Sequence, residues 1–65
     1  MTRSQLSGLQ IGDSVCWQDP DTGDVGTYFI QDILTEAGYL TDLDDVLIIS
    51  DHDGFATEIY ASELH

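Results

Sequence analysis

Two short loops of the sequence carry clustered carboxylates, the side chains that calcium prefers. Their aspartates are Asp19, Asp21, Asp24, Asp51 and Asp53. A calcium loop of the helix–loop–helix type needs glycine at its sixth position and glutamate at its twelfth. Counted from Asp19, these positions hold Asp24 and Ile30, and placing Gly54 sixth puts Ile49 first and Tyr60 last. Both registers fail, so no specific metal site and no cofactor is predicted.

The remaining reactive side chains do not predict catalysis either. Cys16 lies in the middle of an expected strand, and no positive charge nearby would favour its thiolate, so packing is the preferred interpretation. His52 stands between two aspartates at an expected hairpin tip, where a pH-sensing role is the alternative to an ordinary turn residue. The sequence has no lysine and no glycine-rich phosphate loop. We therefore expect a protein that is not an enzyme.

The charge balance restricts the class of partner. Thirteen acidic residues face one arginine, Arg3, which gives a formal net charge of −12 over 65 residues. Such a chain forms one domain and repels both nucleic acid and anionic membranes, whereas a basic protein is attracted. Solubility is the simpler explanation of the same charge. The sequence has no long apolar run, no secretory signal and one cysteine, so a cytoplasmic protein is expected.

Alternating apolar residues predict the strands that would position these side chains. They indicate strands at Ser14–Gln18, 26–35, Val46–Ser50 and 55–60, with tight turns at residues 19–24 and 51–54. Ile33 falls out of phase with Tyr28 and Ile30, which predicts a bulge at residues 31–32. Residues 61–64 resemble a helical turn that buries Leu64. In a simple meander the first and third loops lie at one end, so the loop aspartates would form an acidic rim, with a loose cation site as an alternative.

Four stretches of the sequence resemble small bacterial proteins of unknown function with an SH3-like barrel. They are IGDSVCWQDP at residues 11–20, GTYFI at 26–30, VLII at 46–49 and EIYASEL at 58–64. The resemblance implies an all-β fold for residues 11–65, an antiparallel barrel of about five short strands with a terminal helical turn. Residues 1–10 would form an N-terminal extension. Because little chain remains after the helical turn, the N-terminal segment is expected to supply the missing edge.

The expected strand phases nominate a contact surface. If Val46 and Ile48 face the core, then Leu47, Ile49 and Phe29 point outward, where they would be covered by Leu6 and Leu9 or by another chain. The resemblance adds aromatic residues near the first long loop. The predicted partner-binding residues are Trp17, Asp19, Asp21, Tyr28, Phe29, Leu47, Ile49 and Tyr60.

The function that this surface favours is protein binding. An apolar and aromatic patch would supply contact area, and the acidic rim would select a basic partner. The alternative is an acidic mimic of nucleic acid that occupies a basic groove, which requires carboxylates in rows along one face. A homodimer through Phe29, Leu47 and Ile49 is a third interpretation.

Overall fold

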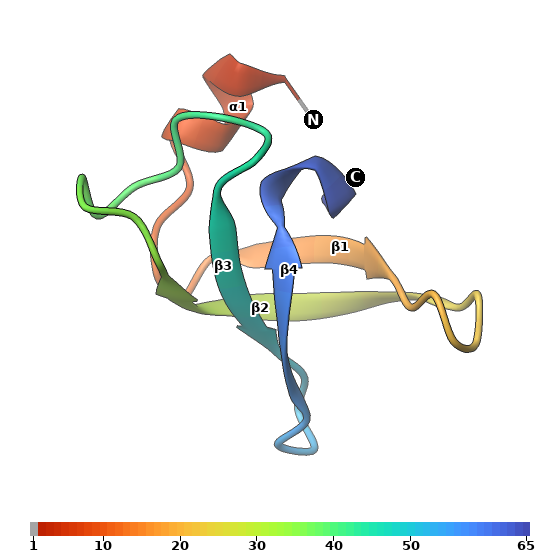
Figure 1. The fold of residues 1–65 in the computed structure, drawn as a ribbon. Coiled ribbons are helices and arrows are strands. Elements are labelled where there is room, and N and C mark those ends of the chain that lie inside the picture. The colour runs from red at the N-terminus through yellow and green to blue at the C-terminus, as the bar shows by residue number, and fades with distance from the viewer. Residues whose placement is uncertain (1) are drawn as a thin grey trace.

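The chain folds into one antiparallel sheet with short helical segments at both ends. A computed structural model describes residues 2–65, and Figure 1 shows its elements. They are α1 (Arg3–Ser7), β1 (Ser14–Gln18), β2 (Val25–Ile33), β3 (Val46–Ser50), β4 (Ala56–Tyr60) and the 3₁₀ helix η1 (Ala61–Glu63). The strands lie in the order β1-β2-β3-β4. The all-β prediction is confirmed, and each predicted strand is present to within two residues at its ends.

The sheet is open rather than closed into a barrel. It has four strands where about five were predicted, and β1 and β4 form its two edges. The free edge of β1 is met by the end of the chain: Leu64 forms a single bridge with Trp17, and the His65 amide donates to the Cys16 carbonyl at 3.2 Å. The expectation that the N-terminal segment supplies this edge is wrong, because that segment is helical.

The N-terminal helix α1 is short but capped. The Thr2 hydroxyl accepts from the Gln5 amide, and the Gln5 side chain accepts from the Thr2 amide, which satisfies two free donors of the first turn. Leu6 projects from α1 into the core and is fully buried. Among residues 2–65, no helix has the length and apolar character needed to cross a membrane.

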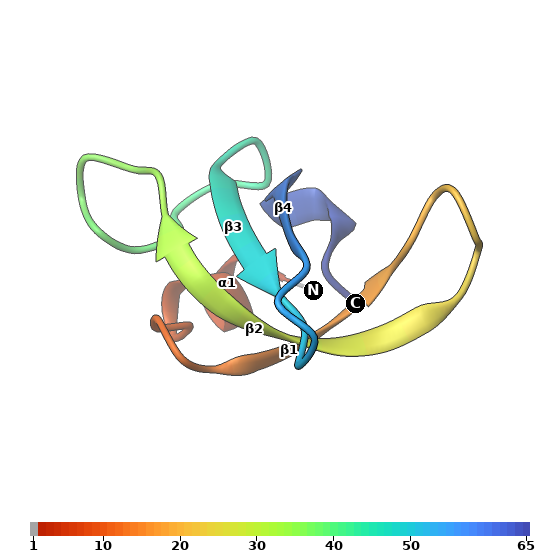
Figure 2. The ribbon, with the colours of Figure 1, turned by 90° about the horizontal axis from the view of Figure 1, so that it is seen from below.

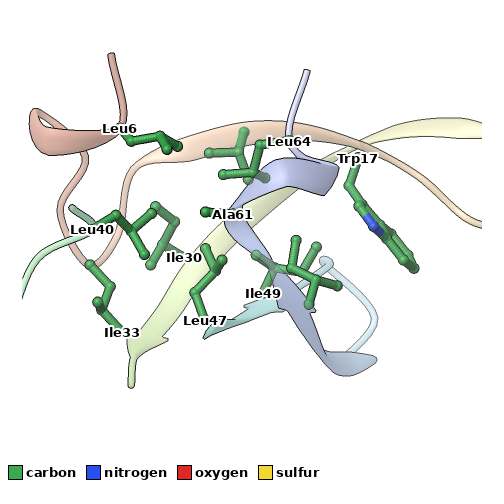
Figure 3. Packing of buried hydrophobic residues seen from close by; sticks show 11 residues of the cluster. Leu6, Trp17, Ile30, Ile33, Leu40, Leu47, Ile49, Ala61 and Leu64 are labelled. Atoms are coloured by element: carbon green, nitrogen blue, oxygen red, sulfur yellow. The ribbon is translucent and has the colours of Figure 1, made fainter. Parts of the chain in front are cut away.

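The core lies between the concave face of the sheet and the segments that cross over it, which include α1 and η1 (Figures 2 and 3). The register of β2 on β3 pairs Ile30 with Ile49 and Ile33 with Leu47, with a shift between Ile30 and Asp32. This confirms the bulge, whose extra residue returns Ile33 to the core. Leu64 is buried as predicted.

The predicted phase of β3 is wrong. Leu47 and Ile49 are fully buried, whereas Val46 and Ile48 are only partly buried on the opposite face. Side chains opposite each other in an antiparallel pair share a face, so the inward Ile30 and Ile33 place their partners Ile49 and Leu47 inside. Four consecutive apolar residues alternate equally well in either phase, and only the pairing with β2 decides between them.

The two acidic turns do not form a common rim. In the β3–β4 turn, Asp51 Oδ1 accepts from the amides of Asp53 and Phe55, both at 2.9 Å, and Gly54 has a φ of 89°. In the β1–β2 loop, Asp19 Oδ1 accepts from the Asp21 amide at 2.8 Å. The loops project in different directions because the sheet is strongly twisted (Figures 1 and 2). Within residues 2–65, no three His, Cys, Asp or Glu side chains are grouped to hold a metal ion.

Candidate functional site

The convex face of the sheet, opposite the core, carries an apolar centre between two carboxylates. Ile48 of β3 lies directly across from Asp32 of β2 on one side and Glu58 of β4 on the other. Residues opposite each other in an antiparallel pair have Cβ atoms about 4.5–5.5 Å apart, so both carboxylates flank the isoleucine. Asp32 and Glu58 are exposed, and Ile48 is half-buried.

Two aromatic residues extend this centre along the sheet. Tyr60 of β4 pairs with Val46 and is 56% exposed. Phe29 of β2 pairs with Ser50, and its ring meets the His52 ring edge-on with centroids 5.1 Å apart. Phe29, Val46, Ile48 and Tyr60 therefore line one face, and we refer to these four residues as the outer strip. Aromatic side chains suit such a surface because they bury large areas on contact.

Asp32 and Glu58, the two carboxylates that flank Ile48, form no ion pair within residues 2–65. The single arginine, Arg3, lies in α1, where its Nη2 is 3.5 Å from Asp42 Oδ1. Among residues 2–65, the one hydrogen bond that the Asp32 carboxylate accepts comes from the following amide, that of Ile33, at 2.9 Å. The negative charge beside Ile48 is therefore unneutralised, which makes this face attractive to a positively charged surface.

The structure divides the predicted contact residues between two faces. Phe29 and Tyr60 lie on the outer strip, as an interaction surface requires. Leu47 and Ile49 are fully buried, so the expectation that they form an exposed apolar face is wrong. Asp19 and Asp21 lie in the exposed β1–β2 loop, where Asp19 is occupied in holding the loop's own backbone.

Trp17 and Tyr28 belong to the concave side. Trp17 is 4% exposed, and its ring packs edge-on against the half-buried Tyr28 with centroids 5.3 Å apart and planes at 83°. The buried Trp17 Nε1 has no hydrogen-bond partner within residues 2–65. Trp17 thus contributes to packing, and the expectation that it presents a contact surface is wrong because the side chain is buried against Tyr28 and the core.

The most strongly hydrogen-bonded carboxylate serves the loop before β3. Asp45 Oδ2 accepts from the Thr41 amide at 2.7 Å, the Asp42 amide at 2.9 Å and the Thr41 hydroxyl at 3.0 Å. The two backbone donors hold the pKa of Asp45 below its ordinary value of 3.8. These bonds fix the loop, which in turn accepts from η1 through the Asp45 and Leu43 carbonyls. The role of Asp45 is structural.

Sequence reasoning missed Val46, Ile48, Asp32 and Glu58. The predicted bulge could have identified them. If residues 31 and 32 count together as one position of the strand, Phe29 and Asp32 lie on the same face, and the residues of β3 that pair with them lie there too. Residues 2–65 form no pocket.

Comparisons with known proteins find no matching family model, no similar curated protein and no similar solved structure.

Proposed function

We propose that the protein is a non-enzymatic interaction module that binds a basic protein through the outer strip. The observation that carries the proposal is the placement of Ile48 between Asp32 and Glu58. A polar rim around an apolar centre is the usual arrangement of a protein interface. The partner would bring an apolar group to Ile48 and lysine or arginine side chains to the two carboxylates.

The charge of the whole chain supports the same partner. A net charge of −12 on a molecule with extents of 30 × 20 × 15 Å produces a negative potential around the entire surface. This potential accelerates encounter with basic proteins and repels acidic ones, while the apolar strip supplies the contact area. Binding should accordingly weaken as the salt concentration rises.

A nucleic-acid mimic is the second candidate, and the charge density favours it. Duplex DNA as long as this molecule, 30 Å, carries roughly 18 phosphates at one charge per ~1.7 Å. A mimic would need its carboxylates in rows. Three acidic segments instead lie apart, in the β1–β2 loop, in the β3–β4 turn and in the loop beside α1 (Figure 1). This separation counts against the mimic and in favour of the outer strip.

Two broader assignments belong to the proposal. The antiparallel order of the strands, followed by η1 and the Leu64–Trp17 bridge, supports a relationship to SH3-like barrels in which the sheet stays open. We propose this relationship for the fold, and no function follows from it. A reducing compartment such as the cytoplasm would keep the exposed Cys16 as a thiol.

The test compares the same isoleucine-to-serine substitution at two surface positions, one in the outer strip and one outside it. Ile48→Ser removes the centre of the strip, and Ile11→Ser changes an isoleucine that is 62% exposed elsewhere. Tagged wild-type and variant proteins would capture partners from a lysate of the source organism at low salt. Each captured protein would then be purified, and its affinity would be measured by calorimetry at low and high salt.

The proposal predicts one basic partner that binds the wild type and Ile11→Ser equally. Ile48→Ser should bind it at least tenfold more weakly, about 1.4 kcal/mol, since truncating a central interface residue has effects of this size. Partners that are acidic or indifferent to salt would contradict the proposal. A partner displaced by duplex DNA and retained by Ile48→Ser would instead favour the mimic.

A further inference from the structure

The two edges of the sheet differ in how their backbone groups are satisfied. At the β1 edge, the Cys16 carbonyl accepts from the His65 amide. At the β4 edge, no strand formed by residues 2–65 pairs with the outer side of Ala56–Tyr60. Figure 1 shows β3 running beside β4. An open edge is a template on which another extended chain can pair.

The hydrogen-bond pattern identifies which groups of β4 are free. The Asp51 amide donates to the Phe55 carbonyl, and the Ala61 amide donates to the Asp45 carbonyl, so these two pairs are hydrogen-bonded across β3 and β4. Hydrogen-bonded and non-bonded pairs alternate in an antiparallel ladder. Thr57 and Ile59 therefore bond to β3, and Ala56, Glu58 and Tyr60 direct their amides and carbonyls outward.

One of these outward groups is already occupied. The Tyr60 amide donates to Glu63 Oε2 at 2.8 Å, which ends the free edge at its C-terminal end. No backbone partner for Ala56 or Glu58 exists on the outer side within residues 2–65, and both residues are exposed. The edge that remains consists of the amide and carbonyl of each of these two residues.

We propose that an extended, basic segment of the partner adds to β4 as a fifth strand, paired with Ala56 and Glu58. This inference rests on the proposed function and specifies how the basic partner binds. An added strand continues the alternation of the sheet, so its convex-side residues would lie beside Glu58 and Tyr60. Lysine or arginine beside Glu58 and an apolar residue beside Tyr60 would extend the outer strip across the new strand.

Charge complementarity selects this occupant over a second copy of the chain. Two copies would bring together charges of −12 each, with Glu58 in the middle of both edges. Like charges placed opposite each other destabilise a strand pair. A basic segment removes the same repulsion and gives Glu58 the cation that it lacks.

The probe is a short, end-capped peptide in which every second residue is alternately lysine and valine, with threonine between them, so that lysine can lie beside Glu58 while valine lies beside Tyr60. Its control is the same peptide with N-methylated backbone amides, which keeps every charge and loses the donors that strand pairing needs. We expect the unmethylated peptide to bind at least tenfold more tightly. In ¹⁵N-labelled protein, hydrogen exchange of the Ala56 and Glu58 amides should slow at least tenfold when that peptide is saturating.

Two substitutions separate backbone pairing from charge. Ala56→Pro removes an outward donor and leaves the β3–β4 ladder intact, since proline is tolerated at an edge position whose amide faces solvent. This substitution should weaken binding of the peptide at least fivefold without altering Trp17 fluorescence. Glu58→Gln should weaken binding of the peptide severalfold. Glu36→Gln, at an exposed loop position, should leave the binding unchanged.

The inference is overturned if both peptides bind equally, if neither binds, or if exchange at Ala56 and Glu58 does not change. Such results leave the proposed function intact wherever Ile48→Ser still abolishes capture of a basic partner. In the reverse outcome, the peptide pairs with β4 but Ile48→Ser does not affect capture of the partner. This result would refute binding through the outer strip and support strand pairing at the β4 edge.

Discussion

Substitutions along β3 test the face assignment on which the outer strip depends. Leu47 is fully buried, where it pairs with Ile33 on one side and Ile59 on the other. Replacing a buried leucine by alanine costs about 2–5 kcal/mol, through lost transfer energy and the cavity that remains. Ile48→Ala on the convex face should cost about 1 kcal/mol, because the side chain is only half-buried and can leave no enclosed cavity.

These costs are large on the scale of the whole molecule. At about 0.05–0.15 kcal/mol per residue, a domain of 65 residues has a free energy of unfolding of roughly 3–10 kcal/mol. Leu47→Ala would remove much of this stability. The milder pair Ile49→Val and Ile48→Val should differ in the same direction, with a cost of about 0.5–1.5 kcal/mol for the buried Ile49 and less for the half-buried Ile48.

Urea unfolding followed by the fluorescence of Trp17 provides the measurement. Trp17 is the single tryptophan and is buried, so its emission should change on unfolding. With an m-value of about 1 kcal/mol/M for so small a domain, Leu47→Ala should lower the urea midpoint by roughly 2 M or more. Ile48→Ala should lower it by about 1 M. A larger loss for Ile48→Ala than for Leu47→Ala would refute the assigned face and the outer strip with it.

Three further predictions concern other parts of the chain. Asp45→Asn should lower the melting temperature at neutral pH. Because the folded-state pKa of Asp45 lies below 3.8, the difference from the wild type should persist above pH 3.8 and vanish as the pH falls through the lower folded-state pKa. The control Asp44→Asn should show no such loss. Raising the salt concentration to about 0.1 M, where the Debye length is ~10 Å, should raise the melting temperature by screening the net charge, and an unchanged value would contradict this. Leu6→Ala should cost about 2–5 kcal/mol in urea unfolding, and a loss below about 0.5 kcal/mol would show that α1 does not pack on the sheet.

Local signals in the sequence were sufficient to locate the strands and turns. The bulge followed from the phase error at Ile33, and the β3–β4 turn followed from Asp53-Gly54, where the positive φ of Gly54 meets the requirement of the turn. The burial of Leu64 followed from the spacing of the terminal turn. Each of these signals depends on a few neighbouring residues.

What the sequence did not predict depends on contacts between distant segments. The face of β3 is decided by its pairing with β2, because Val46, Leu47, Ile48 and Ile49 are all apolar. The directions of the acidic loops depend on the twist of the whole sheet. The cover of β1 depends on Leu64 and His65 reaching across the molecule, which no local pattern indicates.

The open edge and the acidic composition are connected physically. A short exposed strand with free amides and carbonyls invites pairing with other copies of the chain, and proteins commonly suppress this with charge at the edge. Here Glu58 lies in the middle of β4, Glu63 occupies the last outward amide, and each molecule carries a charge of −12. The repulsion that prevents self-pairing becomes attraction when the incoming strand is basic. In the proposed pairing, the same carboxylates would oppose a homodimer at this edge and favour a positively charged partner.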